Sequence, residues 1–291
     1  MNTVTTCSAC GGLAAQIVAA LDDESRERFR LFSDLKYGGL LSDWLLTVPP
    51  VVMQCDGCGH CWYRHQPDPN ELGSMYAAGR PLGGTAKTVL EPSSAMLQKM
   101  TVLRSMLGRR LGKPALLDYG SGSGRWARAA MRAGFEVTAF EPSAVRSHSD
   151  DVPFALVHDL ALLRGQRFAA IQLEQVLEHV PDPMAVLVDL KAYCEPDVLL
   201  RITVPNILRS PEGSALWDLW PFDGTTPHTL APFEHLHGFT PNSLDRLLSR
   251  AGYCNADSLV EWRWQPVNRL RGLAGRWIPS MATTLRFATC R

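Results

Sequence analysis

The chain has 291 residues, of which 46% are hydrophobic and 20% charged, a composition typical of a globular protein with one large core or one domain and an appendage. Lys plus Arg and Asp plus Glu number 29 each, so we expect no basic surface for nucleic acid or an anionic membrane. No run of about 18 apolar residues occurs, and residues 1–7 lack a basic region followed by an apolar core. We therefore expect a cytoplasmic protein with a small-molecule substrate and neither a nucleic-acid nor a membrane partner.

Cysteines are concentrated near the N-terminus, where four of them form two C-x-x-C-G knuckles. The four are Cys7, Cys10, Cys55 and Cys58. Two such turns supply four thiolates at tetrahedral reach around Zn²⁺, and the glycine after each knuckle lets backbone N–H groups face the sulfurs. His60 and Cys61 follow the second knuckle and are alternative ligands. The sequence thus predicts a structural zinc site in a zinc-ribbon-like subdomain over residues 1–62.

The next segments connect this subdomain to the rest of the chain. The run Trp44–Met53 indicates a strand leading into the second knuckle. Residues 63–90 are rich in Pro and Gly and predict a linker, and the amphipathic stretch 93–111 predicts a helix. We therefore assign 63–112 to a linker and leading helix and 113–291 to a catalytic domain. Tyr76 in the linker either reaches the active site or packs the N-terminal subdomain on the sheet.

An apolar strand that runs into three alternating glycines is the most informative feature. The run is Leu116-Leu117-Asp118-Tyr119-Gly120-Ser121-Gly122-Ser123-Gly124-Arg125-Trp126. Glycine permits positive φ and lets a ligand lie against the main chain, while the helix expected near Arg125 offers unpaired N–H groups. A dinucleotide fingerprint needs glycine where Arg125 stands. The D-x-G-x-G-x-G pattern instead resembles the first motif of class I S-adenosylmethionine-dependent methyltransferases, where this loop holds the methionine moiety and adenosine.

A second strand, Phe135–Phe140, ends in Glu141, about 20 residues beyond the glycine loop. A carboxylate there is placed to accept hydrogen bonds from both ribose hydroxyls, so we expect Glu141 to bind the cofactor ribose. His158 and Asp159 follow a third strand, and Asp159 is a candidate acceptor for the adenine amino group, the alternative being a solvated loop acid. The stretch from Gln172 to Pro183 resembles the family's fourth motif, which implies that Gln172 to Glu174 lie along the methionine part of the cofactor.

Strands and helices continue to alternate, which predicts an α/β fold with a doubly wound, mostly parallel sheet. The resemblance implies the Rossmann-like, seven-stranded version of this fold. Residues 207–239 form a long irregular segment that we interpret as a substrate-loop insertion, in which Trp217, Trp220 and Phe222 line either an apolar pocket or the core. Segments 254–264 and 283–289 are expected to be the last strands.

Methyl transfer to an acidic O–H, C–H or N–H group benefits from a base with a pKa near neutral, and histidine fits this role. We rank His235 first and His179 second as the general base. His237 lies in another loop expected above the sheet and is a further candidate. Glu234 is the candidate carboxylate that orients an imidazole. Each histidine has a structural alternative, and proximity alone can also suffice. Residues 234–240 follow the pattern E-H-L-x-x-F-T, which resembles a segment of methyltransferases that act on sugars and other small metabolites. The sugar C-methyltransferases of that group carry a tyrosine where this chain has Pro232.

Three hypotheses follow. The first is an S-adenosylmethionine-dependent methyltransferase acting on a sugar, sugar nucleotide or other secondary metabolite. The second is an RNA methyltransferase that binds RNA with its zinc ribbon. The balanced charge argues against this hypothesis, because RNA binding usually requires a basic face. The third is a noncatalytic adenosylmethionine-binding protein. The acceptor, the methylated atom and the oligomeric state are not specified by the sequence.

Overall fold

The structure, a computed structural model, describes residues 1–48, 50–78, 91–108, 112–143, 152–209, 230–256 and 283–290. The chain divides into two compact units. The knuckle unit comprises Met1–Ala86, Leu177–Pro183 and Pro205–Leu247, and the sheet unit comprises Lys87–Val176, Met184–Val204 and Leu248–Arg291. The knuckle unit thus includes two segments from the part of the sequence assigned to the catalytic domain.

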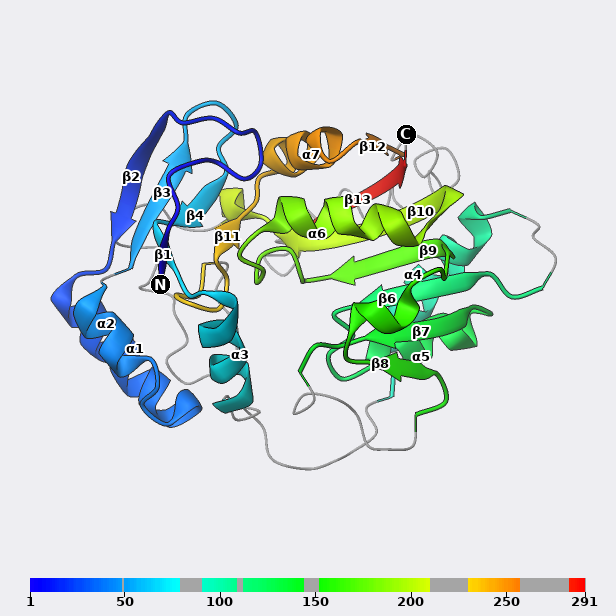
Figure 1. The fold of residues 1–291 in the computed structure, drawn as a ribbon, viewed down its shortest axis with the longest axis horizontal. Helices are drawn as coiled ribbons and strands as arrows, with labels where there is room; N and C mark the ends of the chain where they lie inside the picture. Colours follow the sequence, from blue (N-terminus) through cyan, green and yellow to red (C-terminus); the bar gives the residue numbers. More distant parts are fainter. Residues whose placement is uncertain are drawn as a thin grey trace. The chain divides into compact units, whose positions relative to one another are not determined.

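A seven-stranded sheet forms the centre of the sheet unit (Figure 1). Its strands are β6 (Ala115–Tyr119), β7 (Glu136–Phe140), β8 (Ala155–Val157), β9 (Phe168–Glu174), β10 (Cys194–Pro205), β12 (Tyr253–Asn255) and β13 (Thr283–Cys290). They lie in the order β12-β13-β10-β9-β6-β7-β8. Strands β8, β7, β6, β9 and β10 pair in parallel, and β12 pairs with β13 in antiparallel orientation. The predicted Rossmann-like, mostly parallel sheet is confirmed.

The central strands are mostly apolar because both faces of a parallel sheet are covered. Residues Phe168 to Leu173 of β9 are all buried. The helices of this unit are α4 (Ser94–Met106), α5 (Arg125–Arg132) and α6 (Pro183–Leu190), with short 3₁₀ turns at Leu160–Leu163 and Lys191–Tyr193. Helix α4 starts where the Ser93 side chain accepts a hydrogen bond from the N–H of Met96, close to the predicted start at residue 93. Its buried residues Met100 and Leu103 join the core of the unit.

The strand order reverses direction at β6. Strand β7 follows β6 in the chain and pairs on one side of it, whereas β9 pairs on the other side. In open α/β sheets, ligands bind beyond the carboxyl ends of the strands at such a switch point. The loop after β6 is therefore the expected ligand site of the sheet unit.

The knuckle unit contains a four-stranded antiparallel sheet in the order β11-β4-β3-β2. The strands are β2 (Ala15–Ala20), β3 (Val51–Cys55), β4 (Cys61–Tyr63) and β11 (His237–Gly238), and β1 (Asn2–Thr3) pairs separately with β5 (His65–Gln66). Strand β3 confirms the strand expected before the second knuckle at residues 51–53, whereas the start of the expected run, residues 44–47, lies in helix α2 (Ser42–Thr47). Strand β11 pairs with β4, with His237 opposite Trp62 and Gly238 opposite Cys61.

Four helices complete the described part of this unit: α1 (Asp23–Tyr37), α2 (Ser42–Thr47), α3 (Pro69–Ala78) and α7 (Pro241–Arg250). The last residues of α7 lie beyond Leu247, where the unit ends. A 3₁₀ turn spans Ile207–Arg209. Helix α3 lies within the segment expected to be a linker, so that expectation was wrong for 69–78. Its start is capped by Asp68, whose carboxylate accepts from the N–H groups of Asn70 and Glu71. Composition suggested a linker, but this cap and the burial of Leu72 and Met75 stabilise a helix.

The remaining sequence expectations divide between described and undescribed residues. Thr240 caps α7, because its hydroxyl accepts from the N–H of Ser243 at 2.9 Å. Trp217, Trp220 and Phe222 lie outside the described residues, as do residues 257–264 of one expected strand. Among the described residues, no helix combines the length and apolar character needed to cross a bilayer.

Candidate cofactor, metal and histidine sites

The glycine loop adopts the backbone conformation that only glycine tolerates well. Gly120, Gly122 and Gly124 have φ angles of 73°, 50° and 67°. A Cβ on Gly120 would lie 2.7 Å from Cγ2 of Val176, so both the conformation and the space exclude a side chain there. Gly124 is the N-cap of α5 and offers no capping side chain, which leaves the first N–H groups of the helix free of a side-chain cap.

Glu141 lies next to this loop. It directly follows β7 and is 6% exposed, and its carboxylate accepts from the N–H of Gly122 at 2.8 Å and from the N–H of Ser143 at 3.0 Å. Each carboxylate oxygen keeps acceptor capacity after one such bond. The acid predicted to bind ribose and the predicted cofactor loop are thus brought together in the sheet unit.

Asp118 belongs to a buried polar network across three neighbouring strands. Its Oδ1 accepts from Nε2 of Gln172 at 3.2 Å, and Oε1 of Gln172 accepts from Nη1 of Arg201 at 3.2 Å. Arg201 also forms an ion pair with Glu174, and its guanidinium lies 4.7 Å from the ring centroid of Trp126. Asp118, Gln172 and Arg201 are each at most 2% exposed. Among the described residues, Oδ2 of Asp118 has no hydrogen-bond partner.

Burial raises the pKa of Asp118 to about 7, against a smaller lowering by the hydrogen bond from Gln172. The carboxyl therefore changes charge near neutral pH.

Gln175, directly after Glu174, has a φ of 54°, an uncommon backbone state for a residue with a side chain. Such strain gathers at functional sites, which fits the end of β9 beside Glu174.

Asp159 is exposed and caps a 3₁₀ turn, with Oδ1 accepting from the N–H of Ala161 at 2.8 Å. Oδ1 is thus engaged locally. Neighbouring His158 contacts the backbone oxygen of Glu141 through Nδ1 at 2.6 Å. The loop after β8 is therefore held beside the end of β7.

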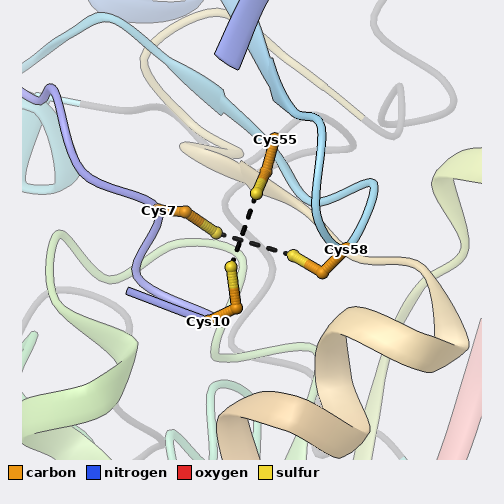
Figure 2. A group of neighbouring side chains, drawn as sticks. All are labelled: Cys7, Cys10, Cys55 and Cys58. Carbon is orange, nitrogen blue, oxygen red and sulfur yellow. Dashed lines mark hydrogen bonds between the residues drawn. The ribbon is translucent and has the colours of Figure 1, made fainter. Parts of the chain in front are cut away.

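In the knuckle unit, the four predicted metal ligands meet at one point (Figure 2). Sγ of Cys7 lies 3.6 Å from Sγ of Cys58, and Sγ of Cys10 lies 3.4 Å from Sγ of Cys55. All four sulfurs lie within 4.8 Å of one another. Four sulfurs about 2.3 Å from a tetrahedral zinc stand about 3.8 Å apart, so the donor set and its spacing fit Zn²⁺.

The two alternative ligands have other partners. Cys61 accepts a hydrogen bond from Nε2 of Gln54 at 3.5 Å, and His60 contacts Ser8 and His237 instead of the sulfurs. The positive φ values of Gly11 and Gly59, 76° and 72°, support the expected role of glycine in shaping both turns. The geometry therefore favours the four-cysteine set.

The predicted catalytic residues of the knuckle unit also gather. The rings of His179 and His235 lie 4.5 Å apart, edge to face, and Nδ1 of His179 lies 2.9 Å from the backbone oxygen of Glu234. Ligand atoms of Glu178, His179 and His235 lie within 4.8 Å of one another. The hydroxyl of Tyr76 lies 3.3 Å from Nδ1 of His179, so the tyrosine that had two possible roles contacts this cluster.

Glu234 has a partner that sequence reasoning missed. The hydroxyl of Tyr37, the last residue of α1, donates to its carboxylate. Phe233, just before Glu234, has a φ of 64°, and its ring contacts Trp44 edge to face at 5.5 Å. Side-chain contacts from α1 and α2 therefore hold a strained turn that presents Glu234 and His235.

His237 is less accessible than the other two histidines. It is 1% exposed, and both ring nitrogens have partners: Nδ1 lies 3.1 Å from Nε2 of His60, and Nε2 lies 3.3 Å from the backbone oxygen of Pro181. Burial lowers its pKa to about 4, so it is neutral at physiological pH. This geometry suits a structural contact better than proton transfer to a substrate.

The sequence search missed Tyr37, Glu178 and Arg201. Arg201 carried a signal, because a charged residue within an otherwise apolar strand requires a buried partner. Glu178 directly precedes a histidine already selected, and its burial was not visible from the sequence. Tyr37 carried no signal, since its contact joins residues 197 positions apart.

Comparison with known proteins assigns the family. Residues 96–257, more than half of the chain, match the family model described as "Methyltransferase domain". The ubiquinone biosynthesis O-methyltransferase of Actinobacillus pleuropneumoniae serotype 5b is 30% identical over 106 residues, which cover 31% of this chain and 45% of that protein. The protein of the same name from Xanthomonas campestris pv. campestris strain B100 is 34% identical over 112 residues, covering 35% of this chain and 46% of the relative.

The chain thus spans about half the length of the curated relatives it matches. Among solved structures, the 1,6-didemethyltoxoflavin-N1-methyltransferase of Burkholderia thailandensis aligns with a TM-score of 0.44 and 20% identity, over 71% of this chain and 86% of that chain. The family match spans the glycine loop, Glu141 and the segment 172–183. The chain therefore belongs to the methyltransferase-domain family.

Proposed function

We propose that the loop of Gly120, Gly122 and Gly124 binds S-adenosylmethionine, with Glu141 accepting hydrogen bonds from the ribose hydroxyls. The observation that carries this proposal is the hydrogen bond from the N–H of Gly122 to Glu141, which holds the acid against the loop. Three glycines with positive φ supply the close approach that a bound nucleoside needs. When bound, the cofactor supplies an electrophilic methyl group.

Three further acids are assigned to the cofactor. The free Oδ2 of Asp118 is the acceptor for the ammonium of the methionine moiety, since a buried anion is stabilised by a cation. Glu174, at the end of β9, lies along the same moiety and is balanced by Arg201. Asp159 accepts from the adenine amino group with Oδ2, because its Oδ1 already accepts from Ala161.

His235 is the proposed general base that removes the acceptor's proton, and His179 is the second candidate. Support comes from the contact of their rings and from the strained turn at Phe233 that presents His235. Glu234 orients this turn through its contact with Tyr37. His237, with both nitrogens engaged, is assigned a positioning role instead of the base role.

The acceptor is proposed to be a small molecule with an acidic hydroxyl or C–H group, such as a sugar, a sugar nucleotide or another secondary metabolite. The names of the two curated relatives support O-methylation of a small molecule. Pro232 stands where sugar C-methyltransferases have a tyrosine, which also favours an oxygen acceptor. The balanced charge of the chain argues against nucleic acid or a membrane as partner.

The four-cysteine cluster is proposed to hold a structural Zn²⁺ bound by Cys7, Cys10, Cys55 and Cys58. The sulfur separations and a donor set of four protein thiols support a closed, structural site. Thiols kept free for metal suit a reducing compartment, so we propose a cytoplasmic location.

The function is tested by screening sugars, sugar nucleotides, phenols and carrier-bound acyl groups for a mass gain of one methyl group, with RNA as a separate arm. His235→Gln is then compared with wild type on the acceptor found. The proposal expects a loss of about 10²–10⁴-fold in kcat with unchanged cofactor affinity. Turnover that survives His235→Gln and His179→Gln would contradict the base assignment, and methylation of RNA alone would contradict the small-molecule acceptor.

A further inference from the structure

A chain of side-chain contacts leads from the four-cysteine cluster into the loop that carries the histidines. His60 follows the second knuckle by two positions and has no exposed surface. Its Nε2 lies 3.2 Å from the hydroxyl of Ser8, between the two cysteines of the first knuckle, and 3.1 Å from Nδ1 of His237. The rings of His60 and His237 stack at 5.3 Å and 21°. His60 therefore connects both knuckles to His237.

The hydrogen positions along this chain follow from its last acceptor. The backbone oxygen of Pro181 only accepts, so Nε2 of His237 must carry the proton that points to it. A neutral imidazole then has an acceptor at Nδ1, and Nε2 of His60 must donate to it. The order of donation is therefore His60 to His237 and His237 to Pro181, with one tautomer for each ring.

Backbone contacts reinforce the same connection. Strand β11 pairs with β4, and the N–H of Tyr63 donates to the oxygen of Leu236 at 3.1 Å. The hydroxyl of Thr240 donates to the oxygen of Cys58 at 3.1 Å. On its other side, the N–H of His237 donates to the oxygen of Glu178 at 3.2 Å. The knuckles thus hold residues 236–240, and His237 in turn holds residues 178–181.

Both candidate bases lie close in the sequence to residues that these contacts hold. His235 is two residues before His237, and His179 lies between Glu178 and Pro181, whose carbonyl oxygens both accept from His237. We propose that His237 is a positioning residue that couples the metal-binding knuckles to the imidazoles of His179 and His235. This inference rests on the proposed function only in giving those imidazoles a catalytic role.

A purely structural histidine would act differently from a positioning residue. If His237 only filled core space, Phe in its place would change stability while leaving the tautomers of His179 and His235 unaltered. If His237 positions the loop, its replacement removes the side-chain bond to the oxygen of Pro181, and the bond between Nδ1 of His179 and the oxygen of Glu234 loses its fixed geometry. The tautomer of His179 therefore separates the two roles.

The test uses the zinc-loaded 291-residue chain with ¹⁵N-labelled histidine, and long-range ¹H–¹⁵N spectra that report which nitrogen of each ring is protonated. Wild type is expected to show Nε2–H for His60 and His237 and Nδ1–H for His179. In His237→Phe, the Nδ1–H signature of His179 is expected to give way to a tautomer mixture, and the resonances of His235 are expected to move. His65→Phe, which alters a histidine of β5, is the matched control and should move neither.

His237→Asn provides the same reading if the Phe variant does not fold, because its amide oxygen can still accept from His60 while the bond to Pro181 is lost. Removal of zinc from wild type with a chelator is the second arm of the test. It should shift the tautomer of His179 toward the same mixture as the His237→Phe substitution does. An unchanged tautomer of His179 in a folded His237 variant, or after zinc removal, would overturn the proposal. Adenosylhomocysteine binding is measured on the same samples: its absence in wild type would refute the proposed cofactor function, whatever the histidine spectra show.

Discussion

The backbone N–H of Gly122 donates a hydrogen bond to Oε2 of Glu141 at 2.8 Å, which joins the loop after β6 to the end of β7. The N–H of Ser143 donates to the other oxygen of the same carboxylate at 3.0 Å. Two residues 19 positions apart are thereby fixed at the switch point of the sheet before any ligand binds. Because the carboxylate of Glu141 is already held in place, less conformational entropy is lost when a ligand binds to it. We therefore expect this hydrogen bond to favour cofactor binding.

Replacing Gly120 with alanine should damage the loop. The residue has a φ of 73°, and a Cβ would lie 2.7 Å from Val176. A residue with a side chain in such a backbone state costs about 1–3 kcal/mol, and the contact adds to this cost. We expect a lower urea midpoint and weaker adenosylhomocysteine binding, measured by denaturation and calorimetry.

Two further variants separate these contributions. Gly134→Ala has a positive φ of 93° but no atom within 4 Å of the new Cβ, so it should show the conformational cost alone. Adding Val176→Ala to Gly120→Ala should restore part of the lost stability. If the double variant is no better than the single one, steric contact with Val176 is not the cause.

Cofactor binding should release protons near pH 6. Burial raises the pKa of Asp118 to about 7, so the carboxyl of the free protein is mostly protonated at that pH, with the charges of Glu174 and Arg201 beside it acting in opposite directions. A bound ammonium favours the carboxylate, which lowers this pKa and releases up to about one proton. Affinity should therefore rise with pH, by at most about tenfold per unit, and level off above pH 7.

Calorimetry in buffers of different ionisation enthalpy measures this release directly. Asp118→Asn is the matched control, since it removes the titrating group while keeping the acceptor for Gln172. The variant should bind more weakly and without proton release. Proton uptake by wild type, or the same release in the variant, would exclude Asp118 as the responsive group.

The ion pair of Arg201 with Glu174 should matter far more than a surface pair. Arg201→Met leaves a largely buried carboxylate without its partner, a change that costs about 3–5 kcal/mol when a buried pair is broken. Adding Glu174→Gln should recover much of the loss. Arg132→Met, which breaks an exposed pair with Glu91, should cost at most about 1 kcal/mol in the same urea titration. Equal costs for the two arginines would show that the buried network contributes little.

One zinc ion per chain is expected, bound by the four-thiol cluster. Cys10→Ser should abolish stoichiometric zinc, measured by elemental analysis, and lower thermal stability, because structural zinc contributes directly to folding. Cys61→Ser is the matched control: its sulfur lies outside the cluster, and Gln54 can donate to a serine hydroxyl. Zinc loss in Cys61→Ser with retention in Cys10→Ser would reverse the ligand assignment.

Local signals explain why the sheet was predictable. Apolar runs, alternating helices and the glycine loop each specify their own conformation, so β6 and β7 followed from the sequence. The two knuckles were similarly informative, since cysteine spacing constrains ligand geometry. Helix α3 was missed because Pro and Gly nearby outweighed the capping signal of Asp68.

Long-range pairing was not predictable. Strand β11 has only two residues, and it joins the knuckle sheet by pairing with β4, more than 170 positions earlier. No local pattern specifies such a partner, so the segments 177–183 and 205–247 could not be assigned to the knuckle unit in advance. The contact of Tyr37 with Glu234 was hidden for the same reason.

The most direct test of the account is calorimetric titration of wild type and Glu141→Gln with adenosylmethionine and adenosylhomocysteine. We expect one binding site in wild type and a loss of roughly 10–100-fold in Glu141→Gln, because a hydrogen bond to a charged group contributes about 1.5–3 kcal/mol. Glu136→Gln, an exposed acid at the start of β7, should bind like wild type. Absence of binding to wild type, or equal affinity in Glu141→Gln, would contradict the assignment of this loop and acid as the cofactor site.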